Sequence, residues 1–521
     1  MEFERPRGTR DFLFEEMRQR KHAEDILRNV FENYGFGEVQ TPLFEDLKLF
    51  TTKSGEEIVD QLYNFKDKGD RDLALRPEIT APIARLYLNE LQKTSKPIKI
   101  YYYGSCFRYE RPQKGRFRQF WQFGCELIGA KTPEGEAEVI AMCNNAIEEL
   151  GITTAEFNVN HLGIIRGLFA HFDIDTTTQR EIMVVIDKGD KELLKESLVG
   201  DNPIIKDKPE LNEVLFKLMD MVGDSSIIAD IEELVSPYEE TKEALEEFKE
   251  LVKTLESFQV FNYKLNLGVA RGLDYYTGIV FEVYVEGLGA QKQVCGGGTY
   301  NLVKLFGGED VVSTGFALGF DRLMNAIEEL NGKPELEPIV STYVAAISDS
   351  TRHDAFNIAQ TLRKADIPTE VDLSRKKFKK ILAYANKIDV KYTVLVGERD
   401  LEEGKVTVKD MLSGEQELIV IDEVATPSTP FASVVIVPSV LSTSESQKPA
   451  SMLSDSVLPL MGFHVVPLSI ECSSAGTVCC AVRISPHVEH FVPSVSPVFV
   501  QDGAAAERIS SVCPAAGISS V

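Results

Sequence analysis

The spacing of apolar residues divides the chain into regions with different periods. Up to about residue 330, stretches that alternate apolar and polar positions are separated by stretches with the 3.6-residue period of helices. The strongest strand pair is Tyr101–Glu110 and Phe120–Ile128, and the loop 111–116 between them contains Pro and Gly. This pattern predicts an antiparallel hairpin. From about 164 to 258 the pattern is that of charged amphipathic helices, which predicts a helical insertion in a first domain, residues 1–330.

The rest of the chain predicts a second, smaller domain and an atypical tail. Residues 331–338 are typical of a linker, and 339–424 alternate strand and helix patterns, which indicates a small, mostly parallel sheet. Residues 425–521 lose helical periodicity, are rich in Ser, Val and Pro, and contain four of the eight cysteines. Three interpretations stay open for this tail: a disordered segment, an added interaction module, or a translated non-native reading frame. Its composition favours the third.

Charge and composition narrow the classes of function. The net charge of −25 argues against indiscriminate nucleic-acid binding, so an RNA partner would need local basic patches such as the hairpin loop. The start of the chain has no apolar signal core, and no stretch approaches the ~20 apolar residues of a membrane span. The cysteines are scattered without zinc-type spacing, which fits a reducing compartment. We therefore expect a cytoplasmic protein with no membrane association.

Candidate chemistry gathers on the predicted hairpin. Charged and amide side chains lie there among large aromatic residues: Arg108, Glu110, Gln122 and Glu126 beside Phe107, Phe120, Trp121 and Phe123. Gln122 and Glu126 are an even number of residues apart, so they share one face of their strand. Charges beside aromatic bulk need partners or a polyanionic ligand. The residue types alone leave two interpretations open, a satisfied ion-pair network on a sheet or a binding site.

The order of these residues resembles motif 2 of class II aminoacyl-tRNA synthetases, in the form of the histidyl-tRNA synthetase family. The matching string is FRYERPQKGRFRQFWQFGCE, residues 107–126. The resemblance implies that ATP lies over the hairpin, with Arg108 on the α-phosphate and Arg116 on the terminal phosphates. It also implies that Glu110 accepts from the adenine amino group and that Phe120 stacks on the ring. On the loop, Arg111 and Gln113 would contact the acceptor end of the tRNA.

Two further segments carry the same resemblance and imply a histidine pocket. LRPEIT, residues 75–80, matches a family segment in which Glu78 and Thr80 bind the substrate's α-ammonium; taken alone, it is also typical of a helix cap. RGLDYY, residues 271–276, matches the signature peculiar to this family. The resemblance implies that Arg271 contacts the substrate carboxylate and the α-phosphate. It also implies that Tyr276 and Glu126 each bind one imidazole nitrogen, that Tyr275 lines the same pocket, and that Gln122 is a further histidine-binding residue.

The remaining motifs resemble the other two class II motifs. GFALGFDRL, residues 315–323, is similar to motif 3, which implies that Arg322 meets the γ-phosphate and that Gly315 and Gly319 let adenine approach the backbone. Before it, residues 293–300 predict a strand that ends in three glycines. The helix, short strand and Pro42 near the start resemble motif 1, the dimerisation element, and imply a homodimer.

Together these motifs imply an α/β multidomain protein. Its parts would be the antiparallel-sheet catalytic core of class II synthetases with a helical insertion, an anticodon-binding α/β domain at 339–424 and an irregular C-terminal tail. The implied reaction is ATP-dependent ligation of L-histidine to tRNA(His) through a histidyl-adenylate, with ATP and Mg²⁺ and without a metal cage made by protein alone. Two alternatives stay open: the synthetase-like regulatory subunit of the first histidine-biosynthetic enzyme, and a class II enzyme for threonine, proline or glycine.

Overall fold

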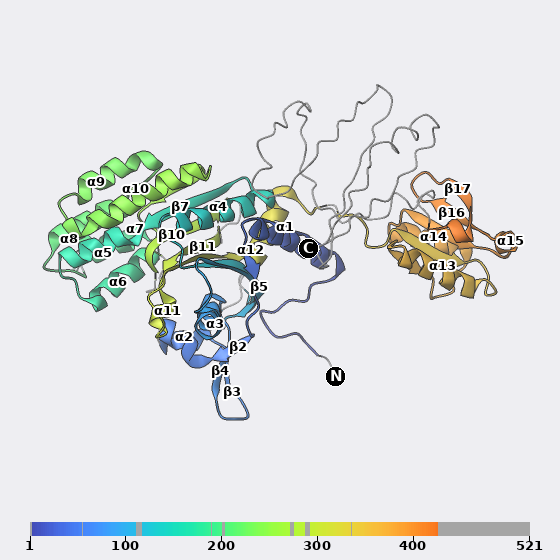
Figure 1. Cartoon of the computed structure of the whole chain (residues 1–521), viewed down its shortest axis with the longest axis horizontal. Helices are drawn as coiled ribbons and strands as arrows, with labels where there is room; N and C mark the ends of the chain where they lie inside the picture. Colours follow the sequence, from blue (N-terminus) through green and yellow to red (C-terminus); the bar gives the residue numbers. More distant parts are fainter. Residues whose placement is uncertain are drawn as a thin grey trace, which may run out of the picture. The chain divides into compact units, whose positions relative to one another are not determined.

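The computed structural model describes residues 3–425, apart from short segments at 55, 111–116, 189, 201–203, 271–275, 287–291 and 335. The predicted tail at 425–521 lies almost wholly outside the described residues. Within the described chain, helices and strands form one large sheet with its covering helices, a three-stranded sheet beside it, and a separate five-stranded sheet (Figure 1).

The large sheet contains nine strands among the described residues and is mostly antiparallel. Only its pairs β1/β5 and β7/β9 are parallel. From one edge to the other the strands are β1 (Gly37–Glu38), β5 (Ile98–Phe107), β6 (Gln119–Ile128), β12 (Ser313–Gly319), β11 (Gln293–Tyr300), β10 (Tyr276–Val285), β7 (Ala155–His161), β9 (Tyr263–Asn266) and β8 (Val222–Gly223). The predicted hairpin is therefore β5–β6, and the motif 3 segment forms the strand next to it.

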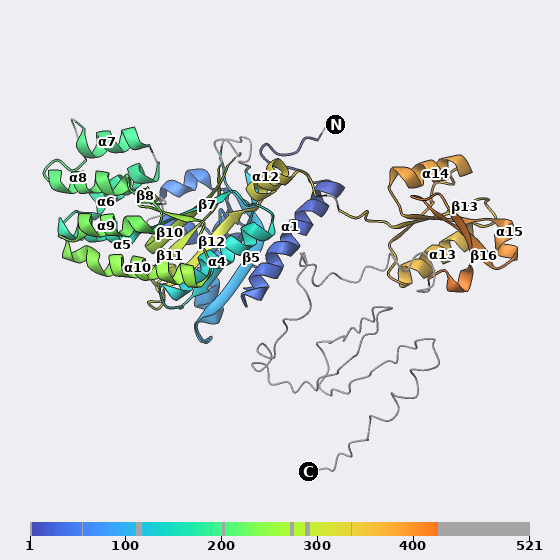
Figure 2. The same ribbon diagram turned by 90° about the horizontal axis from the view of Figure 1, so that it is seen from above.

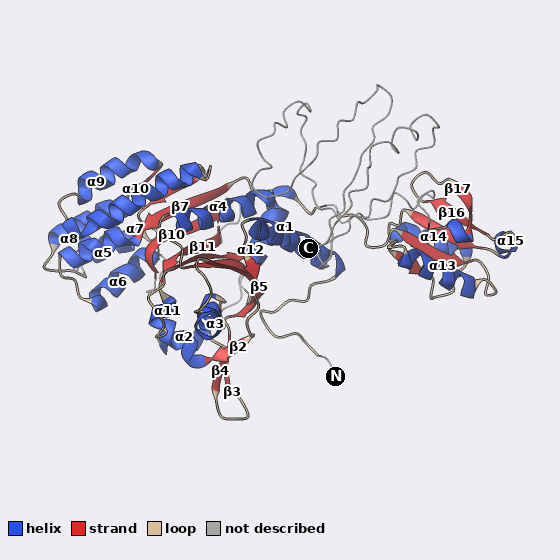
Figure 3. Ribbon diagram, in the orientation of Figure 1, coloured by secondary structure: helices blue, strands red, loops and turns tan. Residues whose placement is uncertain are grey.

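Helices cover both faces of this sheet (Figures 1 and 3). On one face lie α1 (Phe14–Asn33) and α4 (Glu134–Glu149), whose buried side chains share a core with Tyr101 and Phe123. On the other face α3 (Thr80–Leu86) packs on the alternate side chains of β5, including Ile100 and Tyr102. This alternation follows from the two-residue period of a strand. Beside α3 lie α2 (Leu47–Ser54), α11 (Leu302–Leu305) and the small sheet of β2 (Phe44–Asp46), β4 (Asp72–Leu75) and β3 (Asn64–Lys66).

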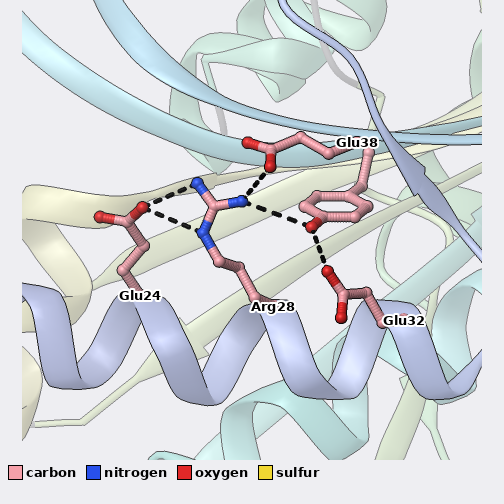
Figure 4. Close-up of polar contacts among 5 residues, drawn as sticks. Glu24, Arg28, Glu32 and Glu38 are labelled. Carbon is pink, nitrogen blue, oxygen red and sulfur yellow. Dashed lines mark hydrogen bonds and ion pairs between the residues drawn. The ribbon is translucent and has the colours of Figure 1, made fainter. Parts of the chain in front are cut away.

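Polar contacts attach α1 to the edge of the sheet (Figure 4). The Arg28 guanidinium donates to the Glu24 carboxylate at 2.7 Å and to Glu38 of β1. The Tyr101 hydroxyl of β5 donates to Glu32 at 2.7 Å. Burial and the Glu32 hydrogen bond raise the pKa of Tyr101 to about 12. These contacts fix the position of α1 along the sheet, in addition to the apolar packing beneath it.

The chain between β7 and β9 is mostly helical, and this is the region where the sequence predicts an insertion (Figure 2). Its helices are α5 (Leu162–His171), α6 (Thr176–Asp187), α7 (Lys191–Val199), α8 (Pro209–Met219), α9 (Ile228–Val235) and α10 (Lys242–Ser257). Apolar residues of α10, such as Phe248 and Leu251, belong to the same core as the large sheet. Asp175 and Asp190 cap α6 and α7 by accepting from backbone N–H groups.

The five-stranded sheet has the order β14-β13-β15-β16-β17. Its elements in chain order are β13 (Thr342–Ala346), α13 (Arg352–Lys364), β14 (Thr369–Val371), α14 (Phe378–Lys387), β15 (Tyr392–Val396), α15 (Glu398–Glu402), β16 (Lys405–Asp410) and β17 (Gln416–Val420). The three strands joined by helices are parallel, and the last two form antiparallel pairs. This is the pattern that the alternating sequence predicts.

Two sequence predictions about strand ends are wrong. The strand predicted to reach Glu110 ends at Phe107, because the chain turns away and the Tyr109 N–H donates to the Gln61 carbonyl. The strand predicted to end at the three glycines continues through them to Tyr300, paired on both sides. Glycine is required there because the neighbouring backbone approaches closely; a Cβ at Gly297 would overlap the Gly315 carbonyl oxygen and the Cβ of Phe316.

Candidate active site

A cavity of about 270 Å³ lies over the ends of β6, β11 and β12, at the start of helix α12 (Phe320–Asn331). Four of the five residues predicted to bind ATP line it: Arg108, Glu110, Phe120 and Arg322. Arg116, the fifth, lies outside the described residues. Gly319 also lines this cavity, and its missing side chain leaves backbone open to a flat ring.

Among the described residues that line this cavity, two are cations, and backbone carbonyls hold both of them. Arg108 follows the end of β5; its Nε donates to the Pro77 carbonyl at 3.0 Å, and its guanidinium carbon lies 5.2 Å from the centroid of the Phe120 ring. Arg322 is the third residue of α12, and its Nη1 donates to the Gln293 carbonyl at 2.6 Å. The tertiary structure thus brings together two guanidinium groups that lie more than 200 residues apart, as a polyphosphate ligand requires.

Asp321 anchors the start of α12 and was missed by the sequence prediction. Its Oδ1 accepts from Arg20 Nη1 of α1 at 2.8 Å, and its Oδ2 accepts from the Trp121 N–H of β6 at 2.9 Å. The Arg20 guanidinium is buried against three aromatic rings, those of Phe12, Trp121 and Phe320. An acidic residue in the first turn of a helix was the only signal available in the sequence. Asp321 sets the position of the neighbouring Arg322.

A second cavity, of about 360 Å³, adjoins the first. Five of the six residues predicted to bind histidine line it: Glu78, Thr80, Gln122, Glu126 and Tyr276. Tyr275, the sixth, lies outside the described residues. The two cavities share Arg108, Gln122, Gln293, Gly296 and Ala317. A ligand in one cavity therefore lies against a ligand in the other.

Burial perturbs the carboxyl group of Glu126 in the second cavity. Its side chain is buried and accepts from the hydroxyls of Tyr300 and Tyr102, the latter at 3.3 Å. Burial raises the pKa of Glu126 to about 7, against hydrogen bonds from Tyr300 and Thr80 that lower it. Neighbouring charges act in both directions, since the Glu78 carboxylate raises this pKa and the Lys53 ammonium lowers it. A carboxyl group poised near pH 7 suits an imidazole, whose own pKa is about 6.5.

Two residues of this carboxyl site were not among those predicted to form the histidine pocket. Tyr300, to which no side-chain role was assigned, contacts Glu126 across a separation of 174 residues. Gly315 lines the second cavity and not the first. A Cβ at Gly315 would lie well inside 3.0 Å of both Glu126 Oε2 and the Cys125 carbonyl. Only glycine at this position leaves room for the Glu126 side chain.

Glu78 stands at the start of α3, where its Oε1 accepts from the Ala81 N–H at 3.2 Å. This contact agrees with the capping interpretation, yet the carboxylate also faces the cavity. Its Oε2 lies 3.2 Å from Nζ of Lys53, a residue of α2 that the sequence did not single out. The cavity therefore contains an ion pair in addition to the predicted residues.

Three further predicted residues, Arg271, Arg111 and Gln113, also lie outside the described residues. Within the described ranges, no group of three or more His, Cys, Asp or Glu side chains could hold a metal ion. Nor is any helix of the described chain long and apolar enough to cross a membrane.

Comparison with known proteins identifies the family. A sequence profile described as "Histidyl-tRNA synthetase" matches residues 8–323. The chain belongs to the histidyl-tRNA synthetase family. A second profile, described as "Anticodon binding domain", matches residues 341–426.

Curated relatives agree with this assignment. The chain is 46% identical over 424 residues to the histidine–tRNA ligase of Methanosarcina acetivorans, covering 81% of this chain and 98% of that protein. It is 44% identical over 426 residues to the histidine–tRNA ligase of Methanocaldococcus jannaschii, with the same coverage. Among solved structures, apo S. aureus histidyl-tRNA synthetase is 29% identical, with a TM-score of 0.62 over 81% of this chain and 99% of that one.

The family assignment confirms the predicted fold class and reaction. The chain is a class II aminoacyl-tRNA synthetase that attaches histidine to tRNA at the expense of ATP, through a histidyl-adenylate. Histidine, ATP and tRNA are its substrates. The anticodon-domain match and the ligase relatives decide against both alternatives, the regulatory subunit and a synthetase for another amino acid.

Proposed function

We propose that the two adjoining cavities divide the substrates of histidine activation between them. ATP occupies the first cavity and histidine the second, so that the amino-acid carboxylate faces the α-phosphate at their shared edge. The observation that carries this proposal is that Arg108 and Gln122 line both cavities. A reaction between two substrates needs their reacting atoms held about 3 Å apart before bonds change.

In the second cavity Glu78 and Thr80 bind the α-ammonium of histidine. Glu126 and Tyr276 take the two imidazole nitrogens, with Gln122 and Tyr275 completing the pocket. A buried carboxyl group and hydroxyl that would lose their partners with any other side chain give strong discrimination. The perturbed Glu126 supports this assignment, since it can accept from or donate to a neutral imidazole.

In the first cavity Phe120 stacks on adenine and Glu110 accepts from its amino group. Arg108 and Arg271 bind the α-phosphate, and Arg271 also contacts the carboxylate of histidine. Arg116 and Arg322 bind the terminal phosphates. A carboxylate oxygen of histidine attacks the α-phosphorus, the bond to the β-phosphate oxygen breaks, and pyrophosphate leaves. Catalysis rests on positioning and on guanidinium groups placed where negative charge develops. No protein nucleophile takes part.

Mg²⁺ fits the side chains of this cleft. Glu282 lines the second cavity and contacts Gln293, which lines both cavities, and Mg²⁺ prefers oxygen ligands from phosphates, water and one or two carboxylates. The bound ion supplies positive charge to the polyphosphate. Glu282 is held in place for such contacts by Gln293, whose amide donates to it at 2.6 Å.

The other assignments extend the proposal beyond the cleft. Residues 1–330 form the catalytic domain with an insertion at about 164–258, 331–338 form the linker, and 339–424 form the anticodon-binding domain. Arg111 and Gln113 contact the tRNA acceptor end. A cytoplasmic location stays a prediction.

We propose a homodimer through motif 1. It is supported by unusually exposed apolar side chains around α1 and β2, including Phe14 at 82% and Phe44 at 52% exposure. Light scattering on the purified protein tests this proposal, and a monomeric mass at micromolar concentration would contradict it.

Steady-state ATP–pyrophosphate exchange tests how the cavities are assigned. Glu78→Gln is expected to raise KM for histidine at least tenfold with little change in KM for ATP, because one charge-assisted contact is worth about 1.5–3 kcal/mol. Phe120→Leu is expected to raise KM for ATP and leave KM for histidine nearly unchanged. Arg271→Ala is expected to abolish exchange while histidine binding stays measurable. Equal effects of the first two variants on both KM values would refute the division.

A further inference from the structure

Lys53 occupies an unusual position for a lysine. It lies near the end of α2, its side chain is only 5% exposed, and it lines the second cavity. Lysine is almost never buried without a partner. Its ammonium lies 3.2 Å from Glu78 Oε2, the carboxylate assigned above to the α-ammonium of histidine. The motifs that led to the family assign no role to this residue.

The charge pattern of the cavity matches an amino-acid head group. Lys53 and Glu78 place one positive and one negative charge side by side on the cavity wall. The head group of histidine is also a pair of opposite charges, with its ammonium and carboxylate on the same carbon. The two pairs are complementary when they lie antiparallel, ammonium on Glu78 and carboxylate on Lys53.

Glu78 has the capacity for both partners. A carboxylate has about four lone-pair sites. The Ala81 N–H and the Lys53 ammonium occupy two of these directions. An arriving ammonium can therefore bind Glu78 while Lys53 remains close enough to meet the adjacent carboxylate.

We propose that Lys53 binds the α-carboxylate of histidine, so that Lys53 and Glu78 together receive the zwitterionic head group of the substrate. This inference rests on the proposed assignment of the second cavity to histidine. It makes Lys53 a specificity residue, because it favours ligands that carry a carboxylate over amines that lack one. It also orients the carboxylate before ATP binds.

Calorimetric binding of histidine and histidinol, without ATP, tests the proposal. Histidinol keeps the imidazole and ammonium of histidine but has a hydroxymethyl group in place of the carboxylate. Lys53→Met is expected to weaken histidine binding about tenfold or more and histidinol binding far less, since only histidine loses a charge-assisted contact. Lys53→Arg should retain most of the preference. Lys48→Met, an exposed lysine on the same helix, should behave as the wild type.

The outcomes distinguish the role of Lys53 from the assignment of the second cavity to histidine. Equal weakening of both ligands in Lys53→Met, or no weakening, would overturn the role of Lys53. Glu78→Gln should weaken both ligands alike, because both carry the ammonium; unchanged binding there would instead overturn the histidine site itself. If Lys53→Met fails to fold, Lys53→Gln removes the charge but keeps a donor for Glu78, and the same comparison of ligands applies.

Discussion

The perturbed carboxyl group of Glu126 predicts how the stability of this synthetase depends on pH. In the unfolded chain a Glu carboxyl group titrates near 4.5, whereas burial raises the pKa of Glu126 to about 7 in the folded protein. Between these values the folded state holds a proton that the unfolded state releases. The free energy of unfolding therefore falls as pH rises through this window, and Glu126 contributes no penalty below it.

The magnitude follows from the size of this difference. One pKa unit corresponds to about 1.36 kcal/mol, so the full penalty above pH 7 is about 3 kcal/mol. Between pH 5 and pH 8 the change is about 2–3 kcal/mol, because part of the window lies below pH 5. In the Glu126→Gln variant the Gln side chain has nearly the same shape as Glu but cannot titrate. Between pH 5 and pH 8 the free energy of unfolding of the variant is therefore expected to rise by about 2–3 kcal/mol relative to that of the wild type, whatever the constant cost of its altered hydrogen bonds.

Urea unfolding followed by tryptophan fluorescence measures this difference in the relevant domain. Trp121 is the only tryptophan of the chain, and it lies in β6, the strand that carries Glu126. Glu149→Gln, at an exposed position on α4, serves as the control and should follow the wild type at every pH. Parallel pH profiles for the wild type and Glu126→Gln would refute the reasoning.

Three further substitutions test particular contacts. Gly315→Ala should abolish histidine activation in the exchange assay and lower the free energy of unfolding, because the added Cβ would overlap Glu126 and the Cys125 carbonyl. Gly37→Ala serves as the control and should have little effect in either assay, because open space surrounds that position. Tyr300→Phe removes a hydrogen bond to the buried carboxylate and should raise KM for histidine about tenfold at constant KM for ATP; an unchanged KM for histidine would contradict this. Asp321→Asn should lower the free energy of unfolding by about 3–5 kcal/mol, since it leaves the buried Arg20 charge without its anion. A smaller loss of unfolding free energy in the Arg20→Met, Asp321→Asn double variant would confirm this cause.

Local patterns in the sequence predicted much of the architecture. Alternation of apolar residues predicted the hairpin that became β5–β6, and its two-residue period placed Gln122 and Glu126 on one face, where both line the second cavity. The five-stranded sheet also follows its predicted order of strands and helices. These features depend on neighbours within one element, which the sequence records directly. Strand ends were less predictable, as at Phe107, because a distant carbonyl decides where pairing stops.

The sequence by itself therefore determined the elements, the family and the types of side chain available for binding. Only the tertiary structure decided which of them meet: Tyr102 and Tyr300 on Glu126, Lys53 on Glu78, and Asp321 between α1 and β6. The physical reason is that periodicity describes faces of single helices and strands, whereas these contacts join segments up to 301 residues apart. The raised pKa of Glu126 has the same origin, since desolvation by the folded chain has no counterpart in any short stretch of sequence.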